Sequence, residues 1–280
     1  MIRAAAGYVA VAALKLLAKL PVPLAHGLGQ PLLPLYLLSL LWRPRMRRRL
    51  SYAAPPGVAK PMFAFAYYSV RLRLALLSLR HLLGRPDGCN RIVENEDLYH
   101  AALATGKPVV LLGWHQGPVE LLHRIPHENP VAAGRRKVLM TAGAFSPALA
   151  AFMRAGRAVV GKEVASPGDL HALRRWERDQ GVLAVMIDQA PGQPEAWIRV
   201  SDCGLQAPYP SRLLEWIEAR QPERLFVSVL WEPGNRIRFR YSPAGVSSLK
   251  ADAAARMATT TEGLGAAQYN WSYTKLRLPD

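Results

Sequence analysis

The pattern of hydrophobic and polar positions changes near residue 86. Before that point the chain consists of apolar stretches of helical length, interrupted by prolines and positive charges. After it, short apolar runs of strand length alternate with longer segments that have the period of amphipathic helices. The pattern therefore predicts an N-terminal helical region, residues 1–86, followed by a single α/β unit, residues 87–280.

Three apolar stretches make up the N-terminal region: residues 1–20, 31–42 and 63–83. The first carries two lysines near its end and no small-residue cleavage site, so we expect an uncleaved helix in the membrane interface, with a true span as the alternative. The second stretch runs directly into a basic cluster of Arg43, Arg45, Arg47, Arg48 and Arg49. Apolar helices beside such clusters are typical of membrane-associating segments, since each cation near an anionic leaflet contributes about 1 kcal/mol.

Apolar runs without alternation follow in the second region, and helical segments separate them. Such runs are typical of strands that are buried on both faces of a parallel sheet. We therefore expect an α/β fold with a central, mostly parallel β-sheet flanked by helices. Strands are predicted at 109–112, 137–141, 158–161, 182–188, 225–231 and 236–241, and helices at 96–104 with Asn95 as cap, from Pro118, at 147–155, 168–180, 211–220 and 251–261.

The net charge of +16 is concentrated in the first region, where thirteen Lys or Arg residues precede the first acid, Asp87. This asymmetry predicts an anionic partner, either nucleic acid or anionic lipid. The basic residues lie among long apolar stretches rather than among polar and aromatic residues, so we expect a membrane surface and no nucleic acid. Cys89 and Cys203 lie far apart, which indicates neither a disulfide framework nor a metal site.

One short stretch, KPVVLLGWHQGPVELL at 107–122, brings together groups suited to catalysis. The run at 109–112 reads as a buried strand, so His115 would lie at its carboxyl end, and Glu120 would fall in the first turn of the next helix. A carboxylate that binds one imidazole nitrogen fixes the tautomer and stabilises the imidazolium formed on proton uptake. The sequence therefore predicts that His115 and Glu120 form a general-base pair. A loop histidine capped by a neighbour is the alternative.

Several other residues are candidates for the same site. Asp188 and Gln189 close a predicted strand, where open α/β sheets assemble their sites, although the aspartate could equally cap the following turn. Arg154 and Arg157 lie near the end of a predicted helix, whose negative pole attracts cations. Two further histidines, His123 and His127, could suggest zinc, but no cysteine or carboxylate set accompanies them, so we expect no metal. The sequence has no phosphate-binding glycine loop or dinucleotide fingerprint, and we expect no cofactor.

Three motifs resemble those of a known family. GWHQGPVELL, with a histidine, four residues and a glutamate, is similar to the catalytic motif of the lysophospholipid acyltransferase superfamily, in particular its bacterial lipid A secondary (late) acyltransferase branch. VLAVMIDQAPG at 182–192 resembles the strand ending in Asp-Gln of that branch, and QYNWSYTKLR at 268–277 resembles its closing aromatic-basic segment. The region after Asp-Gln, EAWIRVSDCGLQAPYPS, departs from the branch's aromatic-glycine run, which leaves the acceptor open.

The resemblance implies an acyltransferase that moves a fatty acyl chain from acyl carrier protein, or acyl-CoA, to a hydroxyl of a lipid A-like acceptor at the cytoplasmic face of a bacterial inner membrane. It also implies His115 as base, Glu120 as its partner, an arginine (Arg157, or Arg154 in reserve) at the oxyanion, and Asp188 with Gln189 in support. The alternatives are a different acceptor, such as a glycerophospholipid, an ornithine-type lipid or a specialised metabolite, or a non-catalytic membrane or nucleic-acid-binding protein that keeps the fold.

Overall fold

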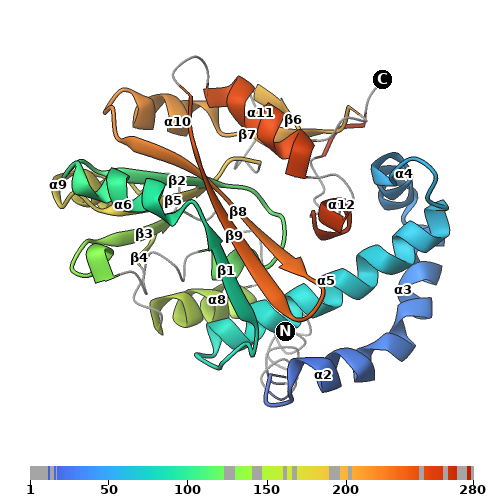
Figure 1. The fold of residues 1–280 in the computed structure, drawn as a ribbon. Coiled ribbons are helices and arrows are strands. Elements are labelled where there is room, and N and C mark those ends of the chain that lie inside the picture. The colour runs from blue at the N-terminus through green and yellow to red at the C-terminus, as the bar shows by residue number, and fades with distance from the viewer. Residues whose placement is uncertain are drawn as a thin grey trace.

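The computed structural model describes residues 12, 16, 18–122, 130–140, 147–159, 163–165, 169–188, 196–200, 204–245, 249–260, 264–269 and 276–278. A seven-stranded sheet with helices on both sides forms the body of the molecule (Figure 1). Its strands are β1 (Asn90–Glu94), β2 (Val109–Gly113), β3 (Lys137–Met140), β4 (Glu163–Ala165), β5 (Val182–Met186), β8 (Glu223–Glu232) and β9 (Arg236–Pro243).

The strand order is β1-β9-β8-β2-β5-β3-β4, and the β8–β9 pairing alone is antiparallel in this sheet. β2 therefore lies at the centre, between β8 and β5. A separate antiparallel hairpin is formed by β6 (Ala196–Arg199) and β7 (Gln206–Tyr209). The predicted α/β fold with a mostly parallel central sheet is confirmed.

The central strands are buried on both faces, which explains their uninterrupted apolar sequences. Val110 and Leu112 of β2 point into a core that includes Trp176 of α9 (Leu170–Arg178). Their neighbours Val109 and Leu111 point the other way. That second core contains Tyr99 of α6 (Glu96–Ala104). The remaining helices of the body are α8 (Pro147–Val159), α10 (Ser211–Glu218), α11 (Leu249–Thr260) and α12 (Leu264–Gln268), with short 3-10 helices η3 (Val119–Leu121) and η4 (Pro130–Ala132).

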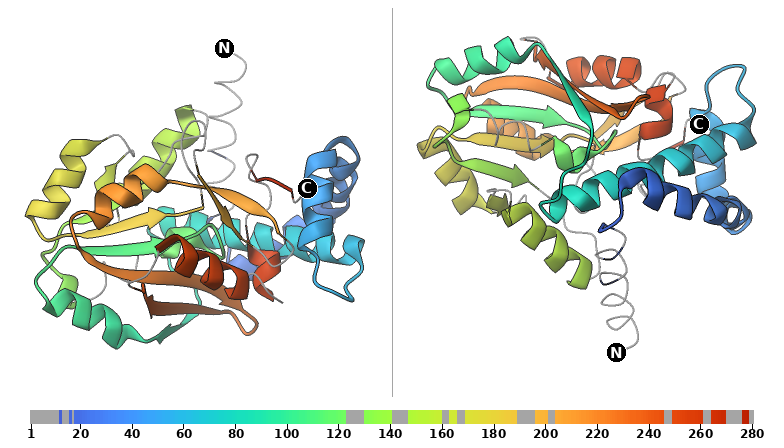
Figure 2. Two further views of the ribbon diagram at one scale, coloured as in Figure 1. Left: turned by 90° about the horizontal axis from the view of Figure 1, so that it is seen from above. Right: turned by 60° about the horizontal axis from the view of Figure 1, so that its bottom comes forward.

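The N-terminal helices are α2 (Val22–Gly29), α3 (Leu33–Ser39), α4 (Pro44–Ala53) and α5 (Lys60–Leu82), with 3-10 helices η1 (Gln30–Leu32) and η2 (Leu40–Trp42). α5 runs along the body and contacts α12, α8 and η3, while α2 and α3 pack on it (Figures 1 and 2). Leu40, Met46 and Tyr67 from these helices belong to the same core as Val110 of β2. The N-terminal helices and the sheet therefore share one hydrophobic core.

Within the described residues, one helix, α5, is long and apolar enough to cross a membrane by composition, and the bent pair Val22–Gly29 and Leu33–Trp42 passes the same test together. In α5, 39% of the apolar window is buried in the protein. The predicted helix at 1–20 lies almost wholly outside the described residues.

Several predicted elements are wrong in detail. The helix expected to stop before Gly156 continues to Val159, and the next strand is Glu163–Ala165 rather than 158–161. A Cβ at Gly156 would lie 2.6 Å from the carbonyl oxygen of Leu82, so this glycine allows close contact with the end of α5 instead of ending a helix. Asn95 does not cap α6 through its side chain, which donates to Tyr241 O at 2.9 Å.

Candidate active site

His115 and Asp188 form a directly hydrogen-bonded pair at the centre of the sheet. The ring Nδ1 of His115 lies 2.8 Å from Asp188 Oδ1, and the backbone N–H of His115 donates to Asp188 Oδ2 at 2.9 Å. Asp188 is 1% exposed and the His115 side chain is 23% exposed. A carboxylate accepts hydrogen bonds, so the neutral tautomer that fits this contact carries its hydrogen on Nδ1 and has its lone pair on Nε2.

The pairing follows from strand register. β2 and β5 are parallel neighbours, with Gly113 opposite Met186. His115 and Asp188 each lie two residues beyond these positions, and Ile187 N–H donates to Gly113 O at 2.9 Å, which continues the ladder toward them. The two side chains therefore meet at the carboxyl ends of adjacent central strands, the usual location of sites in open α/β sheets.

A third group, Tyr269, also binds Asp188. Its buried hydroxyl donates to Asp188 Oδ2 at 2.9 Å. Tyr269 forms an isolated antiparallel bridge with Gln116, and Gln268 O accepts from Gly117 N–H at 3.2 Å. Gln268, at the end of α12, and Tyr269 are therefore bound to the loop that carries His115. Tyr269 is 1% exposed, so its ring packs in the core.

Gly117 makes this arrangement possible. Its φ is +64°, and a Cβ there would lie 1.9 Å from the carbonyl oxygen of Val229. Only glycine avoids both the strained backbone and the collision with β8. Beside it, Trp114 is buried and its indole N–H donates to Gln116 Oε1 at 2.8 Å, so this aromatic side chain packs in the core and not at a surface.

Glu120 does not pair with His115, which corrects the expected His115–Glu120 pair. Both Glu120 oxygens bind Arg157 of α8: Nε donates to Oε2 at 2.9 Å and Nη2 to Oε1 at 2.5 Å. The side chains are 7% and 12% exposed. The expected helix from Pro118 is a 3-10 turn of three residues, Val119–Leu121, and from this turn the Glu120 carboxylate reaches α8 rather than the imidazole.

The other predicted site residues fall in different places. Arg154 is exposed on α8, with no polar partner among the described residues. Gln189, His123 and His127 lie outside the described part of the chain. Among the residues that are described, no group of three His, Cys, Asp or Glu side chains is arranged to hold a metal ion.

Comparison of the chain with protein-family models and with curated proteins gave no match.

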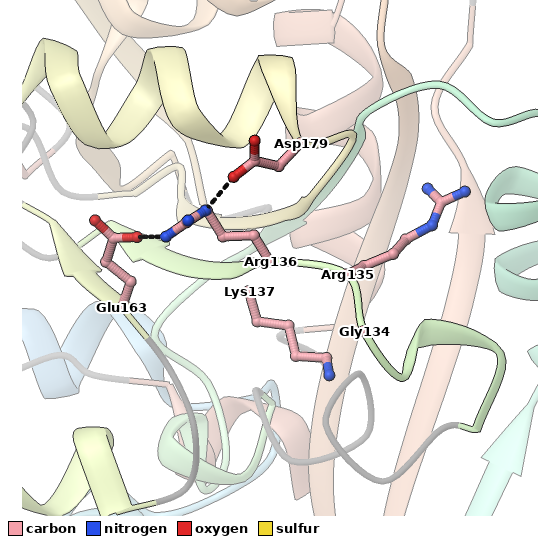
Figure 3. A pocket seen from close by; sticks show the side chains of 6 residues that line it. All are labelled: Gly134, Arg135, Arg136, Lys137, Glu163 and Asp179. Atoms are coloured by element: carbon pink, nitrogen blue, oxygen red, sulfur yellow. Dashed lines mark hydrogen bonds and ion pairs between the residues drawn. The ribbon is translucent and has the colours of Figure 1, made fainter.

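A hollow of about 420 Å³ lies at the opposite, amino end of the sheet (Figure 3). It is lined by Gly134, Arg135, Arg136, Lys137, Glu163 and Asp179. Arg136 binds Glu163 and Asp179, each at 2.7 Å. Hydrogen bonds from Arg178, the larger cause, and from Arg136 lower the pKa of Asp179 to about 2. Arg136, Glu163 and Asp179 pair with one another and Arg135 binds backbone carbonyl oxygens, so we interpret this hollow as an ion-pair cluster at the base of β3 and β4, separate from His115.

Proposed function

We propose that the protein is an acyltransferase that moves a fatty acyl chain from a thioester to a hydroxyl of a lipid acceptor. The observation that carries the proposal is the His115–Asp188 pair, with Nδ1 bound to a buried carboxylate and a more exposed imidazole edge. Such an imidazole is suited to removing a proton from a hydroxyl. Many reactions begin with removal of a proton from a hydroxyl. Among them, the sequence motifs around His115, Asp188 and Tyr269 support acyl transfer.

In this mechanism the acceptor hydroxyl gives its proton to His115 Nε2 as its oxygen attacks the thioester carbonyl. Asp188 keeps the ring oriented and stabilises the imidazolium. The tetrahedral oxyanion then collapses, the carbon–sulfur bond breaks, and the imidazolium returns the proton to the leaving thiolate. The products are an ester and a free thiol, and the proposed reaction needs no cofactor.

The oxyanion needs donors that are fixed before the reaction begins. Arg157 is the arginine that we assign to this role, with backbone N–H groups as the alternative. Its guanidinium is held by two bonds to Glu120, so its orientation does not depend on substrate. In this assignment Glu120 orients Arg157 and Asp188 orients His115. The motif around His115 by itself suggests only one carboxylate, Glu120.

We propose the cytoplasmic face of a bacterial inner membrane as the place of action. Among the described residues, most of the exposed large apolar side chains lie in the N-terminal region, with Val131 and Leu170 as exceptions elsewhere: Leu16, Leu24, Leu28, Leu35, Leu38, Leu41, Trp42, Met62 and Phe65. Arg43, Arg45, Arg47 and Arg48 are exposed beside them. Apolar and basic side chains in one region of the chain favour an anionic lipid surface. An acidic donor such as acyl carrier protein suits the same excess of positive charge.

Lipid mass spectrometry of cells that express the wild type, His115→Gln or His171→Gln tests the proposal. His171 is exposed on α9, so its substitution is a matched control. We expect new acylated lipids with the wild type and the control, and none with His115→Gln. Identical lipid profiles for wild type and His115→Gln, with both proteins folded and present in equal amounts, would overturn acyl transfer by this site.

A further inference from the structure

We infer that Tyr269 is a positioning residue of the active site, acting on His115 through Asp188. The expected effect on kcat rests on the proposed function, whereas the expected effect on the His115 ring does not. Neither the histidine motif nor the strand-end aspartate implies such a role, because Tyr269 lies 81 positions beyond Asp188 in the chain.

The contacts of Asp188 carry the inference. Its carboxylate accepts three hydrogen bonds: from the backbone of His115, from the ring of His115 and from the hydroxyl of Tyr269. The first two come from one residue, so they leave the carboxylate free to turn with that loop. The bond from Tyr269 comes from a separate segment and fixes Oδ2 independently. A carboxylate held from two sides keeps its other oxygen aligned with Nδ1.

Tyr269 is itself held in place by the residue before it. The side chain of Gln268 is buried and binds the backbone of Trp231 at the end of β8: Trp231 N–H donates to Oε1 at 2.7 Å, and Nε2 donates to Trp231 O at 2.7 Å. The Gln268 side chain thus makes the two hydrogen bonds that a neighbouring strand would make to Trp231, and these bonds fix the position of Gln268. The tyrosine hydroxyl therefore projects from a rigid support.

A tyrosine that served only packing would not need to donate a hydrogen bond to Asp188. The protein contains a second buried tyrosine for comparison. Tyr241 is also fully buried, yet its hydroxyl has no hydrogen-bond partner in the described structure. Tyr241→Phe therefore removes a buried hydroxyl without touching Asp188, whereas Tyr269→Phe removes the one that binds it. The two substitutions are chemically identical, and they differ in whether the hydroxyl that is removed donates to Asp188.

The experiment compares wild type, Tyr269→Phe and Tyr241→Phe by ¹⁵N–¹H spectra of the histidine rings, with His115→Gln to assign the His115 signals. We expect one Nδ1–H tautomer for His115 in the wild type and in Tyr241→Phe, and altered or broadened His115 signals in Tyr269→Phe. Acyl-transfer kinetics should show kcat lower by about tenfold in Tyr269→Phe with KM unchanged, the size expected for one hydrogen bond to a charged group.

The outcomes separate the two proposals. Altered His115 signals in Tyr269→Phe support the positioning role even if no variant, wild type included, transfers an acyl chain, and in that case only the proposed function fails. Unchanged His115 signals in a folded Tyr269→Phe overturn the positioning role, whatever the activity. If Tyr269→Phe does not fold, Gln268→Met serves the same test, because it loosens the support of Tyr269 and leaves the hydroxyl in place.

Discussion

Glu120 and Arg157 form a two-bond ion pair between the 3-10 turn after the histidine loop and helix α8. Both side chains are largely buried, and the two residues lie 37 positions apart. A buried charge that loses its partner is costly, whereas removing both charges together costs much less.

We therefore expect Glu120→Ala and Arg157→Ala each to lower the free energy of unfolding by about 3 kcal/mol, and the double variant to lose clearly less than the sum. Chemical denaturation of the four proteins measures this coupling. The more exposed pair Lys107–Glu223, at 3.4 Å with side chains 58% and 32% exposed, is the control and should show a coupling of about 0–1 kcal/mol. Additive losses at Glu120 and Arg157 would contradict the pairing.

The two carboxylates of the site should differ in their effect on catalysis. Asp188→Asn removes the charge that orients His115 and should lower kcat by roughly 100-fold or more. Glu120→Gln keeps the shape of the side chain and one bond to Arg157, so its effect on kcat should be clearly smaller. Initial rates with a thioester donor, after circular dichroism has shown that both variants fold, give the order. A larger loss for Glu120→Gln would restore the His115–Glu120 pair.

Tyr99 and Tyr241 stack in the core with ring centroids 5.2 Å apart, and neither hydroxyl has a hydrogen-bond partner in the described structure. Burial raises the pKa of both phenols, so they stay neutral. An unsatisfied buried hydroxyl costs about 1–3 kcal/mol. Tyr99→Phe and Tyr241→Phe should therefore leave the melting temperature unchanged or raise it. A lower melting temperature in calorimetry would show that these hydroxyls have partners after all.

His26 on α2 makes the packing of α2 on α5 sensitive to acid. Burial lowers the pKa of His26 below its usual 6.5, Arg73 lowers it further, and the contact with Ser69 O opposes both. The folded state thus binds the proton less tightly than the unfolded chain. Stability from this group is complete above about pH 6.5 and is lost as pH falls from 6.5 toward the lower folded value.

Melting curves between pH 8 and pH 5 of wild type, His26→Gln and the exposed control His171→Gln test this dependence. We expect His26→Gln to lose less stability on acidification than the wild type, because the amide does not titrate, and His171→Gln to behave as the wild type. Equal acid sensitivity of all three would exclude His26 as the source.

Binding to anionic vesicles should depend on the exposed arginines of α4. Replacing Arg45, Arg47 and Arg48 by Gln should weaken binding by about 3 kcal/mol, near 100-fold, at low salt. Replacing Arg174, Arg212 and Lys250 removes the same charge from other elements and should have a much smaller effect. Trp42→Glu, at a side chain that is 77% exposed, should weaken binding to neutral vesicles as well. Equal losses for both triple variants would argue against a specific membrane face.

Much of the site could be predicted from the sequence, because it lies at strand ends. Unbroken apolar runs identify β2 and β5, and a polar residue just after each run marks His115 and Asp188. Their contact needed one further fact, that β2 and β5 are neighbours in equal register. Strand order arises from the packing of the whole sheet, so no local pattern carries it.

The partners of Glu120 and Asp188 could not be predicted for a related reason. A five-residue spacing between His115 and Glu120 suggests a local pair, but the direction of the Glu120 side chain depends on a short 3-10 turn and on an arginine of α8. Tyr269 comes from the end of the chain, and its sequence context is equally compatible with packing. The contacts between segments that lie far apart in the sequence could be found only from the three-dimensional structure.

The shared core has a practical consequence for any study of residues 87–280 alone. A truncated chain that starts at residue 87 would lose Leu40, Met46 and Tyr67, which cover the same core as Val110 and Trp114. The exposed apolar surface would promote aggregation during expression. Trimming the chain at residue 87 is therefore the wrong strategy, and purification of the intact chain should preserve the loop that carries His115.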